Sequence, residues 1–98
     1  MKVHWTNRAK TRLKLIYDFI AEDSPMSAIK VIDRLTARSQ LLTELPNSGR
    51  RVPEYARNDV RELLENPYRI IYRVKSDQID VLTVMHYRQV LPHDLKVL

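Results

Sequence analysis

The feature that most constrains the fold of this chain is a change in the spacing of its apolar residues at Gly49, the only glycine. Before Gly49, apolar residues recur at intervals of three and four, which is the period of an amphipathic helix. After Gly49, β-branched and aromatic residues follow the period of two that a strand requires. The sequence therefore predicts two helices followed by most of the sheet, joined at the turn "NSG".

Two helices are predicted before this turn. The first follows Thr6, a candidate N-cap, and continues to about Glu22. The second begins at Ser24, another candidate cap, with Pro25 in the first turn, where proline is tolerated, and continues to about Leu45. Because only one or two residues separate the helices, they should form an αα-hairpin. The apolar faces expected to be buried are Ala9, Leu13, Ile16, Tyr17 and Ile20 on the first helix, and Ala28, Ile29, Val31, Ile32, Leu35, Ser39, Leu42 and Leu45 on the second.

Four strands are predicted, a short one at 2–5 and three after the turn, at 60–64, 68–74 and 78–87. The connections between the last three are short enough for hairpins. The run 78–87 is apolar on both of its alternations, which is typical of a strand inside a sheet. We therefore expect one α+β domain over residues 1–98, an antiparallel sheet with the N-terminal αα-hairpin packed on one face, in the order β-α-α-β-β-β.

Composition narrows the class of protein. No apolar run approaches the ~20 residues of a membrane span, and the N-terminus "MKVHWTNRAK" lacks the apolar core of a signal peptide. The absence of cysteine excludes disulfides and thiolate zinc sites, and the three histidines lack metal-ligand spacing. We therefore expect a cytoplasmic protein that has no metal, no cofactor and no membrane partner.

Positive charge is concentrated after the turn. The chain has 17 basic and 12 acidic residues, and the segment 50–75 is rich in arginine, which suits bidentate contact with phosphate or carboxylate. If the helices cover one sheet face, these arginines can meet an anionic partner on the other. Alternatively, Arg61 and Glu62 are members of ordinary cross-strand ion pairs. The candidate anion-binding residues are Arg50, Arg51, Arg61, Arg69 and Arg73.

The strands also carry groups for acid and base chemistry. Metal-independent RNA cleavage needs a base for the ribose 2′-OH, a cation for the phosphate and an acid for the leaving oxygen. By alternation, His86 lies on the face of Leu82 and Val84, and Tyr87 lies on the opposite face. The register between strands decides whether Arg69 and His86 converge, and the sequence leaves this open.

Several motifs, in order, resemble the ParE/RelE superfamily of toxins from type II toxin–antitoxin modules, which includes ParE-like plasmid stabilization proteins. The motifs are "WTNRAKTRLKLIYDFIAEDSP", "LPNSGRRVPE", "VRELLENPYRIIYRV" and "MHYRQ", and they span nearly the whole chain. The resemblance implies the β-α-α-β-β-β fold and a growth-arresting toxin neutralised by a small cognate antitoxin. It also implies that oligomers form only through the antitoxin complex.

The resemblance implies two alternative targets. ParE-like members poison DNA gyrase, and the length of this chain and its long helical hairpin favour that target. RelE- and YoeB-like members cut mRNA on the ribosome without a metal. In that alternative Glu54 looks like the general base, Arg61 a phosphate contact, Arg69 the phosphate clamp, and His86 with Tyr87 the acid end. A further alternative is a non-toxic, basic nucleic-acid-binding module, so the sequence does not decide whether the protein is an enzyme.

Overall fold

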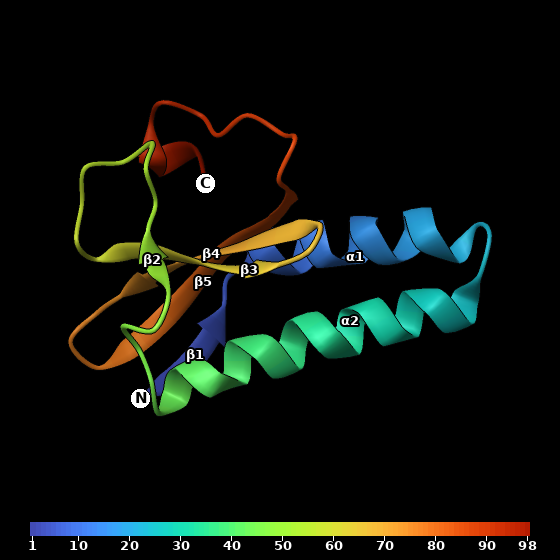
Figure 1. Ribbon diagram of the computed structural model, residues 1–98, viewed down its shortest axis with the longest axis horizontal. Coiled ribbons are helices and arrows are strands. Elements are labelled where there is room, and N and C mark those ends of the chain that lie inside the picture. Colours follow the sequence, from blue (N-terminus) through green and yellow to red (C-terminus); the bar gives the residue numbers. More distant parts are fainter.

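Figure 1 shows the computed structural model, which describes residues 1–98. A hairpin of two helices packs on one face of a five-stranded sheet, so the predicted α+β class and helical hairpin are confirmed. Neither helix has the length and apolarity needed to cross a bilayer. The elements are β1 (Lys2–Trp5), α1 (Asn7–Ala21), α2 (Pro25–Gln40), β2 (Arg50–Arg51), β3 (Val60–Glu65), β4 (Tyr68–Val74) and β5 (Gln78–His86), with 3₁₀ turns at Leu41–Thr43 and Leu95–Val97.

Both predicted helix caps are present. The Thr6 hydroxyl accepts a hydrogen bond from the backbone N–H of Ala9 at 3.2 Å, and the Ser24 hydroxyl accepts one from Ser27 at 3.1 Å. Each bond satisfies a backbone donor that has no partner inside its helix. Pro25 occupies the first turn of α2, as predicted. The Ser24 cap and Pro25 explain why α2 can begin only three residues after α1 ends.

The second helix is shorter than predicted, because α2 ends at Gln40 and continues only as a 3₁₀ turn. Leu35, Ser39 and Leu42 are fully buried, as expected. Ile29 and Leu45 were expected to widen the buried stripe, and that prediction is wrong, because their exposed fractions are 46% and 59%. Ile29 lies in the first half of α2, which projects beyond the sheet (Figure 1), and Leu45 follows the end of the helical turns.

The strand order is β1-β5-β4-β3-β2, which places β5 inside the sheet, as its apolar pattern predicted. The sheet is mixed rather than wholly antiparallel, because β1 pairs in parallel with β5, whereas all other neighbours are antiparallel. β2 was not predicted. It contains only Arg50 and Arg51, opposite Glu62 and Arg61 of β3, and two exposed arginines give no apolar alternation to recognise.

A bulge in β5 changes which side chains share a face. Ile71 of β4 pairs with Thr83, but the next residue, Tyr72, pairs with Val81, so Leu82 has no partner. An extra residue in one strand reverses the alternation beyond it. Val84 therefore packs in the helix-side core, and the simple alternation that grouped His86 with Leu82 is wrong.

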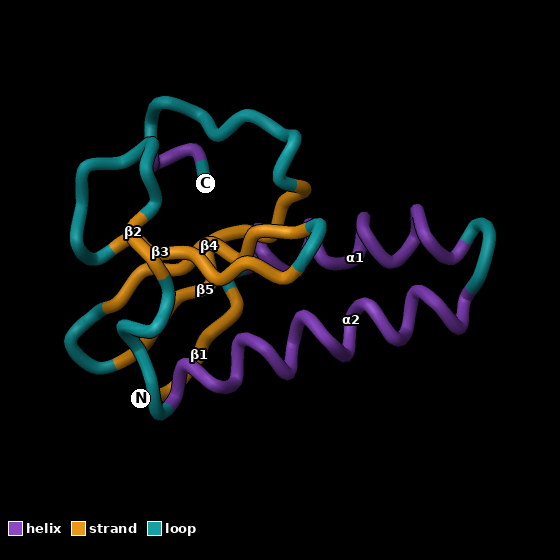
Figure 2. The backbone as a smooth tube through the Cα atoms, in the orientation of Figure 1, coloured by secondary structure: helices purple, strands orange, loops and turns teal.

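Two hydrophobic cores lie on opposite faces of the sheet. The larger one joins the helices to the sheet and includes Ala9, Leu35, Ile70 and Tyr72. On the other face, Leu91 and the partly buried Leu95 and Leu98 of the C-terminal segment cover a smaller core. The two longest loops, between β2 and β3 and after β5, lie side by side there (Figure 2), joined by a 2.6 Å hydrogen bond from the Tyr55 hydroxyl to the Pro92 carbonyl. The face expected to be free is therefore covered at one end.

Candidate functional site

The uncovered part of that face forms a pocket of about 800 Å³, which we call the Arg69 pocket. It contains a charged centre from β2, β4 and the loop after β2, and an apolar rim from the turn between β3 and β4. Of the four residues predicted as a catalytic set, Glu54, Arg69 and Tyr87 line it and His86 does not. The lining residues are Arg50, Pro53, Glu54, Leu64, Asn66, Pro67, Tyr68, Arg69 and Tyr87.

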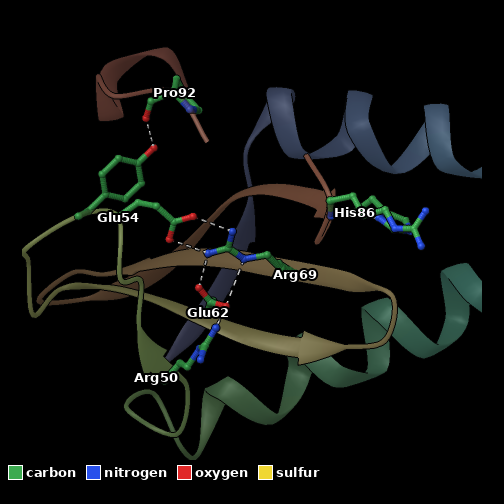
Figure 3. A network of polar contacts seen from close by, with 8 residues as sticks. Arg50, Glu54, Glu62, Arg69, His86 and Pro92 are labelled. Carbon is green, nitrogen blue, oxygen red and sulfur yellow. Dashed lines mark hydrogen bonds and ion pairs between the residues drawn. The ribbon is translucent and has the colours of Figure 1, made fainter. Parts of the chain in front are cut away.

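Arg69 is the centre of an ion-pair network at the floor of the pocket (Figure 3). Its Nη2 lies 2.6 Å from Oε2 of Glu62, and its Nη1 lies 3.0 Å from Oε2 of Glu54. Arg50 completes the network at 3.2 Å from Oε1 of Glu62. The side chain of Glu62 is fully buried and that of Arg69 is only 8% exposed. The Arg69 guanidinium therefore has two carboxylate partners inside the molecule.

The network fixes the ionisation of both groups that reach the pocket. The hydrogen bonds from Arg69 lower the pKa of Glu54, although partial burial opposes the shift. The same carboxylate, together with Glu62, raises the pKa of Arg69 above its ordinary value. A general base works best with a pKa near the working pH, and Glu54 is shifted away from that range. The arrangement favours holding charge over transferring protons.

His86 lies on the opposite face of the sheet from Arg69. It pairs with Tyr68 across β4 and β5, whereas Arg69 pairs with Met85, and its side chain lies toward α1 (Figure 3). Nδ1 of His86 accepts the backbone N–H of Arg88 at 3.1 Å. Tyr87 lines the Arg69 pocket, and its ring stacks on His86 at a centroid distance of 4.8 Å. The structure therefore separates His86 from Glu54 and Arg69, but it leaves Tyr87, the other residue of the predicted acid end, in their pocket.

Of the other predicted anion-binding arginines, Arg50 lines the Arg69 pocket, and the remaining three lie apart from it. Arg73, on the Arg69 face, is 3.1 Å from Asp59. Arg61 donates to the backbone carbonyl of Gly49 at 2.9 Å, on the helix side of β3. Arg51 is exposed and belongs to none of the ion pairs. The alternative that Arg61 and Glu62 form cross-strand ion pairs is confirmed for Glu62, because its partner Arg50 faces it on β2. It is wrong for Arg61, which donates to a backbone carbonyl and belongs to none of the ion pairs.

A second hollow, which the sequence analysis missed, lies between α1 and the end of β5. Its volume is about 430 Å³, and we call it the α1–β5 groove. Its apolar wall includes Leu15 and Phe19, whose exposed fractions are 54% and 75%. These residues fall outside the predicted buried stripe of the first helix, which was the signal available in the sequence. The groove is lined by Arg12, Leu15, Ile16, Phe19, Tyr68, Val84, His86, Arg88 and Gln89.

Comparisons with known proteins agree with this architecture. Residues 3–91 match the family model described as the ParE toxin of the type II toxin-antitoxin system, parDE. A Sinorhizobium fredii protein named "Putative toxin Y4kP" is 38% identical over 96 residues, 96% of each chain. "Toxin RelE2" of Caulobacter vibrioides is 34% identical over 86 residues, 87% of this chain and 93% of that protein.

Two solved structures share the fold. A chain from the chromosomal ParDE system of P. aeruginosa is 29% identical and superposes with a TM-score of 0.73, covering 88% of this chain and 95% of its own. A chain from the RelBE2 toxin-antitoxin complex of Mycobacterium tuberculosis is 19% identical, with a TM-score of 0.54 over 87% of this chain and 95% of its own. The second match bears on the fold alone.

Proposed function

The chain belongs to the ParE toxin family of type II toxin-antitoxin systems, and on that premise we propose that it arrests growth by binding DNA gyrase. Gyrase is the target that the sequence resemblance to ParE-like members implies. We further propose that a cognate antitoxin neutralises the toxin, because the structural relatives come from ParDE and RelBE toxin-antitoxin systems. In this mechanism the toxin itself breaks no bond.

The observation that carries the choice of target is the pairing of Arg69 with two carboxylates, together with the placement of His86 on the other face of the sheet. RNA cleavage requires a base, a phosphate-binding cation and an acid around one phosphodiester. Here Arg69 is matched by Glu54 and Glu62, while His86 lies on the other face. A phosphate could bind Arg69 only by competing with a carboxylate that already holds it. These features support a binding mechanism.

Two observations favour the rival function, a ribosome-dependent mRNA endoribonuclease. Glu54, Arg69 and Tyr87 do line one pocket, together with Arg50. A relative named RelE2 is also 34% identical to this chain. In this alternative Tyr87 would donate the proton to the leaving oxygen, since it is the only member of the predicted acid end that lines the pocket.

The two mechanisms are distinguished by inducing the toxin in a bacterial host without its antitoxin. We expect growth arrest with gyrase trapped covalently on DNA and with intact mRNA. His86→Gln and Tyr87→Phe should arrest growth as the parent chain does, because a toxin that breaks no RNA does not need a proton donor at either position. Both variants retain the fold's main contacts, since neither residue belongs to the buried cores.

Codon-positioned mRNA cuts that disappear in Tyr87→Phe or Glu54→Gln would overturn the gyrase proposal in favour of the endoribonuclease. Normal growth on induction, with the folded protein present in the cell, would instead favour the non-toxic basic module. Co-expression of a small acidic protein encoded beside the toxin gene should restore growth. Failure of every neighbouring small open reading frame to do so would contradict the antitoxin part of the proposal.

A further inference from the structure

We propose that two copies of this chain associate through α1, with the two helices antiparallel across a two-fold axis. The contact surface is a row of exposed residues on α1, which we call the α1 stripe. Part of the stripe forms one wall of the α1–β5 groove. The inference goes beyond the proposed function, because it concerns the toxin without gyrase and without an antitoxin. It departs from the expectation that oligomers form only through the antitoxin complex.

The α1 stripe has the spacing of a seam between two helices. Its residues follow one another at intervals of four, three, four and three, which is the heptad spacing of helices that pack side by side. From its first residue to its last the stripe is about 21 Å long, or about four turns. Every member is exposed, so no other segment of the chain covers the stripe. The members are Arg8, Arg12, Leu15, Phe19 and Glu22.

The order of charges along the stripe is self-complementary when the helices are antiparallel. The arginines lie in its N-terminal half, and Glu22, whose φ of −55 and ψ of −39 are helical, ends it. An antiparallel pair centred between Leu15 and Phe19 places Leu15 beside the partner's Phe19, and it places Arg12 beside the partner's Glu22. The two-fold axis makes each of these contacts occur twice. A parallel pair would instead place like charges side by side, so the charges select the antiparallel arrangement.

These charges have no partner inside the molecule. None of the ion pairs includes Arg8, Arg12 or Glu22. The α1–β5 groove has no aspartate or glutamate in its lining, and Arg88, which lines it from the chain after β5, is also outside the ion pairs. The glutamate of a second copy therefore meets two guanidinium groups there, those of Arg12 and Arg88. Charge complementarity of this kind selects the partner and its orientation.

The helix dipole of α1 disfavours this order of charges. A helix is stabilised by acidic residues in its first turn and by basic residues in its last turn. α1 has neither, since Arg8 lies in its first turn and Glu22 is its C-cap. Both side chains thus oppose the dipole of their own helix. An antiparallel neighbour reverses the situation, because it brings the acidic end of one helix beside the basic half of the other.

Nucleic acid is the other class of ligand that free arginines suggest, and it fits the stripe less well. Phosphate contacts need cations, but they need neither a carboxylate nor exposed apolar side chains. Glu22 would repel a phosphate backbone that follows the stripe. Leu15 and Phe19, with exposed fractions of 54% and 75%, form an apolar centre that a second helix can cover.

The test is the concentration dependence of the oligomeric state. A single contact between two helices is smaller than the interface of a stable dimer, which buries about 1,200 Å² or more. We therefore expect a weak dimer, with a dissociation constant of about 0.1 mM. In sedimentation velocity at low salt, the sedimentation coefficient of the purified full chain should rise as its concentration increases from about 10 µM to about 1 mM. A monomer over the whole range would overturn the proposal.

Charge reversal tests whether the stripe is the contact surface. Arg12→Glu and Glu22→Arg each place like charges side by side at two symmetric contacts, so each should weaken the dimer about tenfold. The double variant restores opposite charges and should recover the parent dissociation constant to within about threefold. Lys10→Glu is the matched control, because it makes the same change of charge on an exposed residue of α1 outside the stripe. Equal loss in Lys10→Glu and Arg12→Glu, or no recovery in the double variant, would overturn the proposal.

The absence of cysteine from the chain permits a direct test of the orientation. After mild oxidation, a mixture of the single variants Leu15→Cys and Phe19→Cys should give mainly the disulfide that joins position 15 to position 19, because a disulfide requires neighbouring Cα atoms. Faster formation of the dimers that join identical positions would indicate a parallel pair and would also overturn the proposal. These measurements involve neither gyrase nor growth arrest, so they can fail while the gyrase proposal stands.

Discussion

The two hollows at this end of the molecule hold arginines in opposite electrostatic situations. In the Arg69 pocket, the buried guanidinium is matched by a fully buried glutamate and a half-buried one. In the α1–β5 groove, across the sheet, Arg12 and Arg88 have no acidic partner. Tyr68 lines both hollows, so they lie back to back through the sheet. A paired, buried arginine already has its partners inside the fold, whereas an unpaired, exposed one remains available to another molecule.

This contrast changes how the arginine-rich segment should be interpreted. The sequence concentrates positive charge after Gly49, which suggested an anion-binding sheet face. In the folded protein most of those cations are matched internally, by Glu54, Glu62 and Asp59. The arginines without an acidic partner are those of the α1–β5 groove, Arg12 on α1 and Arg88 just after β5. The distribution of charge along a chain thus predicts the presence of cations but not which of them are free.

The largest effect that we predict comes from removing Arg69. Arg69→Ala leaves the buried carboxylate of Glu62 with only the half-exposed Arg50 as partner. Removing one partner of a buried ion pair lowers the free energy of unfolding by about 3–5 kcal/mol. Urea denaturation, followed by circular dichroism, measures the change. Loss of less than about 1 kcal/mol would show that Arg69 is free to bind ligands rather than required for folding.

Arg73→Ala is the matched control, because Arg73 lies on the same strand and the same face. Its partner Asp59 is partly exposed and the ion pair is at the surface, so its removal should cost at most about 1 kcal/mol. The double substitution Arg69→Met with Glu62→Leu removes both buried charges together. It should recover most of the stability lost in Arg69→Ala, since a buried pair replaced by apolar groups is often neutral.

A smaller effect is expected from the contact between Gly49 and Tyr72, which holds the start of β2 against the sheet. β2 in turn places Arg50 in the Arg69 pocket. The backbone N–H of Gly49 donates to the buried hydroxyl of Tyr72 at 2.9 Å. Tyr72→Phe leaves that N–H without a partner, which costs about 1–3 kcal/mol. Tyr87→Phe is the control, because the ring is largely exposed, and it should stay within about 0.5 kcal/mol. Equal effects in the two variants, measured by urea denaturation, would contradict this role for Tyr72.

The same contact explains why position 49 is a glycine, the only one in the chain. A Cβ added at Gly49 would lie 2.5 Å from the backbone oxygen of Glu62 and 2.5 Å from the Tyr72 hydroxyl. The sequence identified Gly49 as the boundary between helical and strand periods, which is correct. Its structural reason, close approach of β2 to β3 and Tyr72, depends on the pairing of distant segments. No local pattern contains that information.

The fold class, both caps and three of the four strands of the C-terminal half followed from local patterns, because periodicity and capping act within a few residues. What failed was decided by tertiary context. The unpaired Leu82 reverses the alternation of β5, so His86 lies across the sheet from Arg69. The C-terminal leucines Leu95 and Leu98 cover a face that was expected to be free. Bulges and the docking of tails leave little trace in a single sequence.

Acid should weaken the Arg69 network through Glu54. Because Arg69 lowers the folded-state pKa of Glu54 below its ordinary value of 4.5, the pair stabilises the fold fully above the unfolded-state pKa. This contribution is lost as the pH falls through the folded-state pKa. Glu54→Gln should therefore reduce stability at pH 7 by less than about 1 kcal/mol, since Glu54 is 43% exposed. The difference from the parent should shrink in denaturation curves at about pH 3. A difference that grows at low pH would contradict the pairing.

The smallest predicted change in stability belongs to the α1–β5 groove. It tests whether the side chains of this groove, unlike Arg69 in its pocket, are dispensable for folding. Phe19 is 75% exposed, so Phe19→Ser removes little buried area and should change the unfolding free energy by no more than about 0.5 kcal/mol. Leu13, on the same helix, packs against the helix-side core, and Leu13→Ser should cost about 2 kcal/mol or more. If Phe19→Ser were as costly as Leu13→Ser in urea denaturation, the exposed stripe would be part of the core. If the unfolding free energy of Phe19→Ser equals that of the parent, the large apolar side chain of Phe19 does not stabilise the fold.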